Sequence, residues 1–200
     1  SLLLLAATLA TAAPAPPDAV VREATDRVLK MVMDPEFRGD ERRAERRAGM
    51  IQVVDQLFDW QLMAQLAMGR HWRGLTAEQQ AEFVPVFKEL IVSSYLGHVE
   101  SYEGEKIAYQ PGVVDMDKGR GEVKAVVSTN VRGDVDILYR LYLKGEEWQV
   151  RDVVVIGVSL VSNYRTQLND LMHRQNFQEV MDLLRKRIAE QRGNGEKAPL

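Results

Sequence analysis

Side chains capable of chemistry are scattered along this sequence without the spacing that a metal site requires. His71, His98 and His173 each lack a second histidine four residues away, and none belongs to a His-x-x-Glu pair. Zinc sites are usually built from such closely spaced ligands. The chain has no cysteine, which excludes disulfides, zinc–thiolate sites and a thiol nucleophile. The sequence therefore predicts no metal and no cofactor.

The acidic, glycine and serine residues give equally weak catalytic signals. Asp115 and Asp117 are two residues apart, but the acidic ladder of a calcium loop does not follow them. The Gly-Arg-Gly segment at 119–121 does not precede a helix, as a phosphate-binding loop would. Ser159 and Ser162 lack the context of a nucleophile elbow. These residues predict no catalytic centre.

Composition describes an ordinary globular protein. The 200 residues suit one domain, with 46% hydrophobic and 28% charged residues. A formal net charge of −3 does not favour binding of polyanions, so no nucleic-acid partner is expected.

The first residues have the pattern of an export signal. An apolar run at 2–9 precedes small residues and prolines at 10–17. Eight apolar residues are too few to span a bilayer, which needs about 20. We interpret residues 1–15 as a signal-peptide remnant, 18–191 as a single domain and 192–200 as a flexible tail. The domain is then expected outside the cytoplasm, as a soluble protein.

Hydrophobic periodicity predicts helices, then strands, then helices. Helical spacing covers about 18–33, 40–58, 59–68 and a longer helix from 76, followed after the strands by 163–174 and 177–191. Thr76 to Gln79 is a capping box, Gly69 suits a helix end, and Pro85 should kink the longer helix. The helix that follows the last strand is expected to open near Ser162 and Asn163.

Alternation of apolar and polar residues predicts four antiparallel strands. They include Ile107/Tyr109, the segments 123–129 and 135–143, and a final strand from Trp148 to Val158. Helices, a strand meander and further helices indicate an α+β fold in one domain.

The apolar side chains exceed what a thin two-layer packing needs. That excess either fills a large core or lines a cavity for an apolar ligand, and the pattern alone leaves both open. A third possibility is an enzyme with a cone like that of ketosteroid isomerase, acting on small apolar substrates. Against it, Asp136 and Tyr139 fall on opposite strand faces by period two.

Arginines crowd the segment 38–47, at positions 38, 42, 43, 46 and 47. The nearby acids Asp40, Glu41 and Glu45 are too few to neutralise all five, so two positive charges should remain. The segment is either a solvated, ion-paired helix face or a docking surface for an anionic membrane or an acidic partner.

Two sequence blocks together resemble one protein family. The first runs from Phe58 to Phe83 and contains Met-Gly-Arg-His-Trp-Arg at 68–73. The second runs from Trp148 to Leu168 and contains Gly-Val-Ser-Leu-Val-Ser-Asn-Tyr-Arg at 157–165. The chain is similar, over most of residues 18–188, to the MlaC-like (toluene-tolerance) family of periplasmic phospholipid-binding proteins.

The resemblance implies helices closing over a curved four-stranded antiparallel sheet, with an apolar lipid pocket between them. It implies no catalysis, but a monomeric periplasmic carrier of diacyl phospholipid that maintains outer-membrane lipid asymmetry. The implied partners are an inner-membrane ABC transporter complex with an MCE-domain subunit and an outer-membrane lipoprotein–porin complex.

The apolar pattern, rather than the family blocks, predicts the residues that line this pocket. They are Phe83, Phe87, Leu90 and Ile91 of the kinked helix, and Val127, Ile137, Tyr139, Leu141, Val154 and Ile156 of the sheet. On this prediction, aspartate in place of Leu141 or Ile156 removes bound lipid, because a buried unpaired charge is costly.

Overall fold

Helices precede and follow one antiparallel sheet in the computed structural model, which describes residues 14–37, 39–129 and 133–193. The α-helices are α1 (Pro17–Met33), α2 (Arg43–Leu57), α3 (Trp60–Met68), α4 (Ala77–Glu100), α5 (Leu160–Arg174) and α6 (Phe177–Gly193). Short 3₁₀ helices are η1 (Pro35–Phe37), η2 (Asp40–Arg42) and η3 (Gly69–Gly74). The predicted export segment 1–15 and tail 192–200 lie mostly outside the described residues.

The sheet is larger than the four predicted strands. Its strands are β1 (Lys106–Tyr109), β2 (Val113–Asp115), β3 (Arg120–Thr129), β4 (Gly133–Lys144), β5 (Glu147–Val155) and β6 (Val158–Ser159). The order is β1-β3-β4-β5-β6, with β2 also paired to β3, and every pairing is antiparallel. The α+β class is confirmed. The additions are short: β2 has three residues, and a turn at Ile156–Gly157 divides the predicted last strand into β5 and β6.

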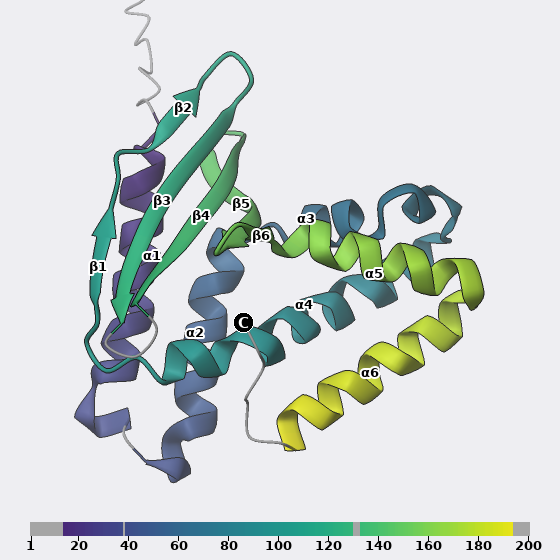
Figure 1. The fold of residues 1–200 in the computed structure, drawn as a ribbon, viewed down its shortest axis with the longest axis horizontal. Helices are drawn as coiled ribbons and strands as arrows, with labels where there is room; N and C mark the ends of the chain where they lie inside the picture. Colours follow the sequence, from purple (N-terminus) through teal and green to yellow (C-terminus); the bar gives the residue numbers. More distant parts are fainter. Residues whose placement is uncertain (1–13, 38, 130–132, 194–200) are drawn as a thin grey trace, which may run out of the picture.

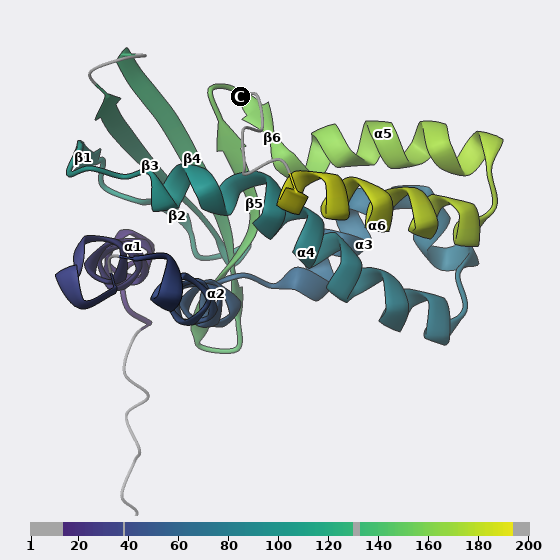
Figure 2. The ribbon, with the colours of Figure 1, turned by 90° about the horizontal axis from the view of Figure 1, so that it is seen from below.

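The elements form two lobes (Figure 1). The sheet, α1 and α2 make the sheet lobe, while α3, α5, α6 and the first half of α4 make the helical lobe. Seen from below, the strands arc over α1 and α2, and α4 runs from one lobe into the other (Figure 2). The long helix α4 therefore connects the lobes, and Pro85 lies within it without ending it.

Helix boundaries follow local capping chemistry. Thr76 and Gln79 form the predicted capping box of α4, and Gly69 ends α3 with φ of 58°. For α5 the prediction was wrong, because the cap is Ser159 rather than Ser162 or Asn163. The Ser159 hydroxyl accepts the Ser162 N–H at 3.0 Å.

A bulge in β5 decides which of its side chains face α1. Arg140 pairs with Asp152 and Leu141 with Val150, so Arg151 is an extra residue without a partner opposite it. Since strand side chains alternate with period two, one inserted residue moves every later side chain to the other face.

The turn that joins β5 to β6 is strained at Ile156. Val155 pairs with Val158, and the two residues between them both have positive φ, 50° at Ile156 and 77° at Gly157. Such a turn favours Asn-Gly, because a β-branched residue fits the left-handed region poorly. The Ile156 side chain is also mostly exposed, at 57%.

Replacing Ile156 with Asn should therefore stabilise the protein. We expect Ile156→Asn to raise the free energy of unfolding by about 1 kcal/mol, because asparagine tolerates positive φ. Urea unfolding measures the change. Val158→Asn, at an equally exposed position of the same turn without positive φ, is the control. If the two variants shift the midpoint equally, the backbone strain at Ile156 is not the cause.

Candidate functional site

The two faces of the sheet differ in chemistry. One face, called here the inner face, is turned toward α1: a Cβ at Gly121 would lie 3.5 Å from Pro17. The outer face carries charged side chains, including the ion pairs Lys124–Asp136 at 3.2 Å and Arg140–Glu122 at 3.4 Å. The strand register gives the inner face these members: Ile107, Tyr109, Val123, Ala125, Val127, Val135, Ile137, Tyr139, Leu141, Val150, Val153 and Val155.

The protein covers this apolar face unevenly. At the end near Pro17, Val123, Leu141 and Val150 are completely buried. Toward the β3–β4 turn, Val127, Ile137 and Val155 are only half-buried, although they belong to the same face. Partly covered apolar surface of this kind marks a place where an apolar ligand or partner can bind. This half-covered part of the inner face is the candidate functional site.

Four of the six predicted sheet residues lie on the inner face, and two do not. Val127, Ile137, Tyr139 and Leu141 face α1 as predicted. Val154 pairs with Leu138 on the outer face, and Ile156 lies in the exposed turn. Alternation continued from Trp148 and Val150 predicted both, but the bulge at Arg151 reverses it. The residues that take the inner positions are Val153 and Val155.

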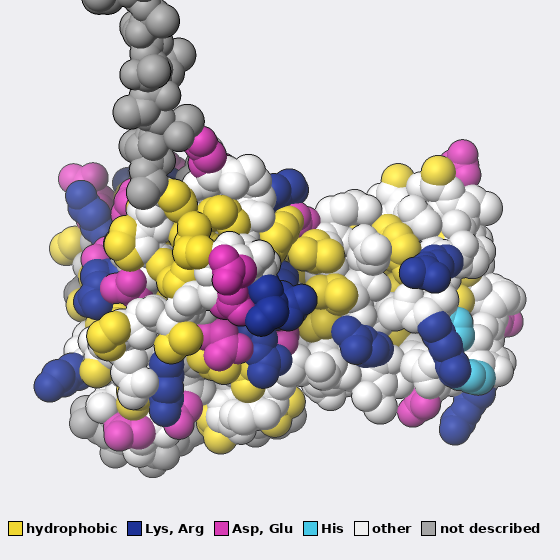
Figure 3. Space-filling model, turned by 90° about the horizontal axis from the view of Figure 1, so that it is seen from above, with side chains coloured by type: hydrophobic (Ala, Val, Ile, Leu, Met, Phe, Trp, Pro, Cys, Tyr) yellow, Lys and Arg dark blue, Asp and Glu magenta, His cyan; other side chains and the backbone are white. Residues whose placement is uncertain are grey.

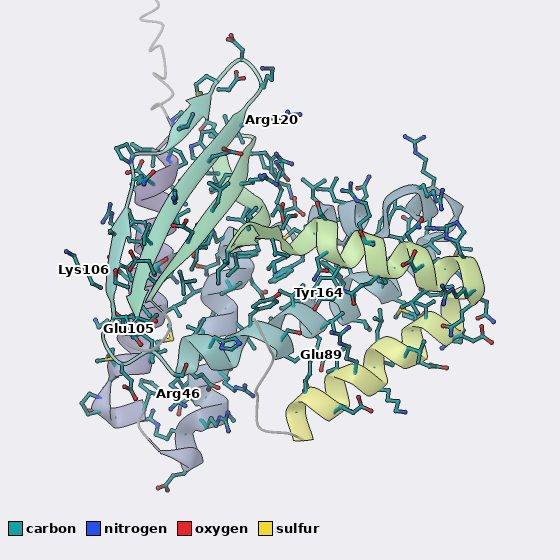
Figure 4. The ribbon with its side chains drawn as sticks, viewed as in Figure 1. Arg46, Glu89, Glu105, Lys106, Arg120 and Tyr164 are labelled. Carbon is teal, nitrogen blue, oxygen red and sulfur yellow. The ribbon has the colours of Figure 1, made fainter. Side chains whose placement is uncertain are left out.

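The four predicted helix residues lie in the core of the helical lobe. Phe83, Phe87, Leu90 and Ile91 are at most 5% exposed. Phe83 stacks on Phe87, and Phe87 meets Tyr164 of α5 edge to face at 5.7 Å. In Figure 4, Tyr164 lies between α5 and α4. These side chains fix α4 against its helical neighbours and do not line the candidate site.

Tyrosines place polar groups along the apolar inner face. Burial raises the pKa of the Tyr139 phenol to about 12; Tyr109 acts in the same direction, and a hydrogen bond from Thr25 acts against it. The guanidinium of Arg22 lies 4.4 Å from the centre of the Tyr109 ring. These polar groups of α1 and the sheet are suited to contact the polar end of an amphipathic ligand.

The acid–base pair considered for an enzyme with a ketosteroid-isomerase-like cone does not form. Asp136 is on the outer face with Lys124, while Tyr139 is on the inner face, so they form no acid–base pair. Among the described residues, no group of three His, Asp or Glu side chains is arranged to hold a metal ion.

A separate pocket of about 210 Å³ lies between α2, α4 and α6. Its apolar lining is Ile51, Val92 and Leu96, and its charged rim includes the ion pair between Arg192 and Glu89. None of the ten predicted pocket residues lines it. It is smaller than typical ligand pockets, which start at about 300 Å³.

The arginine-rich segment is paired through a residue distant in sequence. Arg43, Arg46 and Arg47 of α2 all reach Glu100, the last residue of α4, at 3.2, 3.4 and 3.1 Å. Figure 4 shows Arg46 beside the end of α4. Arg42 pairs with Glu45 at 3.0 Å, and Arg38 lies outside the described residues. The count of nearby acids missed Glu100, but one carboxylate cannot neutralise three guanidinium groups, so the surplus of positive charge stays a prediction.

Asp59 links the helical lobe to the sheet. Its carboxylate caps α3 by accepting the Leu62 N–H at 2.8 Å, accepts the Tyr142 hydroxyl and pairs with Lys144 at 2.9 Å. Burial acts to raise the pKa of Asp59, but the hydrogen bonds from Tyr142, Leu62 and Lys144 outweigh it, and the pKa is lowered. The carboxylate is thus held ionised at this junction.

The lowered pKa of Asp59 predicts acid sensitivity. Since its pKa is lower in the folded than in the unfolded state, its contribution is present above about pH 4 and disappears as pH falls through the folded value. We expect Asp59→Asn, which keeps the cap, to cost about 2 kcal/mol at pH 7. Below pH 4, the free energy of unfolding of this variant should also fall less steeply with pH than that of the wild type. Urea unfolding across this range tests it, and parallel curves would contradict it.

Fold and site together define an α+β protein with one curved antiparallel sheet and a half-covered apolar face. The phospholipid-binding protein from Ralstonia solanacearum, solved in complex with a phospholipid, has a similar fold, with a TM-score of 0.76 and 28% identity. The similarity covers 88% of this chain and 99% of that one.

Sequence comparison identifies the family. The model of the MlaC protein family matches residues 22–186, and the chain belongs to this family. Toluene tolerance protein ttg2D of Pseudomonas putida is 30% identical over 105 residues, 52% of this chain and 48% of that protein, so the match spans about half its length. In the described residues, no helix has the length and apolar character to cross a membrane.

Proposed function

We propose that this protein is a periplasmic phospholipid carrier that holds acyl chains against the half-covered inner face of its sheet. The observation that carries the proposal is this apolar face, left partly open, in a fold shared with a protein solved with a phospholipid bound. The proposed polar contacts to the head group come from Tyr109, Tyr139 and Arg22.

Physical chemistry makes such a carrier feasible without catalysis. Moving one methylene group of an acyl chain from water into an apolar site lowers its free energy by about 0.8 kcal/mol. The relevant comparison for a carrier, however, is between bilayer and protein, and both are apolar. Transfer can then be nearly balanced, provided that the protein excludes water from the chains during transit. In the protein, the half-covered inner face is the apolar surface that would receive the acyl chains.

The family context supports a proposal for the partners between which the carrier moves lipid. We propose that the carrier moves phospholipid between an inner-membrane ABC transporter with an MCE-domain subunit and an outer-membrane lipoprotein–porin complex. Such transport maintains the lipid asymmetry of the outer membrane.

Mass spectrometry of the purified protein tests carrier function. The intact protein should carry diacyl phospholipid in stoichiometric amount, detected in the extract after denaturation, or should take it up from liposomes. Absence of lipid from the extract together with no uptake would overturn the proposal. It would then favour an interaction module with a filled core.

A further inference from the structure

The two sequence blocks that carry the family resemblance meet at one surface of the helical lobe. Arg70 and His71 of η3 lie against α5, where Arg70 hydrogen-bonds His173 and His71 Nε2 is 3.2 Å from Asn169 Oδ1. Arg165 Nε donates to a main-chain carbonyl near the end of α3 at 2.7 Å. Arg165, Asn169 and His173 follow one another at one-turn intervals, so they form one row along α5.

This row and η3 form a basic seam, defined as Arg70, Arg73 and Arg165 with His71 and His173. Arg70 and Arg73 are three residues apart in a 3₁₀ helix, so their side chains share one side. All three arginines are exposed. Figure 3 shows Lys, Arg and His side chains over the helical lobe, with acidic side chains mostly toward its edges.

The arginines of the seam have no acidic partners in the described part of the chain. Within the described ranges, none of Arg70, Arg73 and Arg165 takes part in an ion pair, whereas Arg140 and Arg185 each pair with carboxylates. The hydrogen bonds of the seam go to the His173 ring and to a main-chain carbonyl, which leave most guanidinium donors facing solvent. A guanidinium binds phosphate through two parallel hydrogen bonds, so the seam suits phosphate groups.

We propose that the basic seam binds the phosphate groups of an anionic phospholipid bilayer and orients the carrier at the membrane surface. The inference rests on the proposed carrier function, because a carrier must approach a membrane to exchange lipid. The whole chain has a net charge of −3, so attraction to an anionic bilayer must be local. The seam supplies this local attraction.

The composition of the seam favours a bilayer over an acidic protein. Protein interfaces usually centre on buried aromatic or apolar anchors. The large exposed apolar side chains of the described chain lie on other elements: Met33, Val113, Val114, Met116, Ile156, Val158 and Leu183. Beside the seam, α5 presents the exposed polar side chains Ser162 and Thr166. Charge and hydrogen bonding, rather than apolar burial, are therefore what this surface offers.

Vesicle co-sedimentation of the full chain tests the proposal. The wild type should bind vesicles containing about one third phosphatidylglycerol, bind pure phosphatidylcholine far less, and lose binding between about 50 and 300 mM salt. Arg70→Glu with Arg73→Glu should weaken binding to the anionic vesicles at least tenfold, since each basic residue near the surface contributes about 1 kcal/mol. Lys106→Glu with Lys186→Glu, an equal charge change at exposed positions elsewhere, should remain within twofold of the wild type.

The lipid content of the same preparations separates this proposal from carrier function. The seam variant should retain its bound phospholipid, because the seam is in the helical lobe and the inner face is in the sheet lobe. Equal vesicle binding by the seam variant and the wild type would overturn the membrane proposal. The membrane proposal would also be overturned if the wild type retained acidic proteins but did not bind anionic vesicles. A wild type that lacks lipid but binds vesicles through the seam would contradict only the carrier function.

Discussion

Val155→Asp should release the phospholipid that the purified protein carries, whereas Val154→Asp, one residue earlier on the same strand, should leave it bound. Both valines are half-buried, but Val155 is on the inner face and Val154 is on the outer face. Among acyl chains, an aspartate would be a desolvated charge without a partner. We expect lipid content to fall at least tenfold in Val155→Asp and to stay near the wild-type level in Val154→Asp. Quantitative lipid extraction provides the measurement.

The pair of variants also controls for folding. Position 154 experiences the same charge on the same strand, so a general disturbance of β5 would affect both proteins. Circular dichroism should show similar spectra for the two. If both retain lipid, the inner face is not the binding surface; if both lose it while folded, the effect comes from the strand as a whole. Leu141→Asp is less informative, because Leu141 is fully buried and its replacement would disturb the fold.

Alternation of apolar and polar residues predicted the inward-facing side chains of β3 and β4 correctly, but not those at the end of β5. In β3 and β4 the pattern continues without interruption, so Val127, Ile137 and Tyr139 were placed correctly on one face. In β5 the sequence Arg151-Asp152-Val153 offers no sign of where the extra residue lies. The bulge is fixed by pairing with Arg140 and Leu141, which alternation within β5 cannot show. A strand was correctly predicted here, but the face that each of its later side chains occupies depends on pairing with β4.

Long-range ion pairs were the other feature beyond reach of the sequence. The arginines of α2 were counted against acids within a few residues, which is where helical spacing brings partners. Glu100 is more than 50 residues further along the chain and is brought there by the length of α4 and its packing against α1. Local composition therefore missed Glu100, the counter-ion that three arginines of α2 share.

The family blocks contain only part of the proposed lipid site. Arg70 and His71 of the first block and Arg165 of the second meet at the basic seam in the helical lobe. The second block also contains Val155 of the candidate site, at the end of β5, whereas Val127 and Ile137 belong to β3 and β4, outside both blocks. Most of the proposed site therefore had to be located from the alternation of the strands.

Removing the charge of Glu100 should lower the stability of the protein substantially. Its side chain is only 8% exposed, and three arginines of α2 surround it. Glu100→Gln would leave these positive charges close together without the carboxylate, and Arg46, at 14% exposed, is the least able to reach water. Breaking a buried pair costs about 3–5 kcal/mol, and partial exposure of Arg43 and Arg47 reduces this to about 2 kcal/mol here. Urea unfolding at pH 7 gives the value.

Two further variants test whether charge is the cause. Arg46→Met in the Glu100→Gln background should recover part of the lost stability, because it removes the most buried of the unbalanced charges. Glu45→Gln, which breaks the exposed pair with Arg42, should leave the midpoint unchanged. An unchanged midpoint in Glu100→Gln would show that the arginines of α2 are stable without Glu100. Its role in joining α2 to the end of α4 would then have to be assigned to the apolar contacts of Leu96, a residue one helical turn earlier.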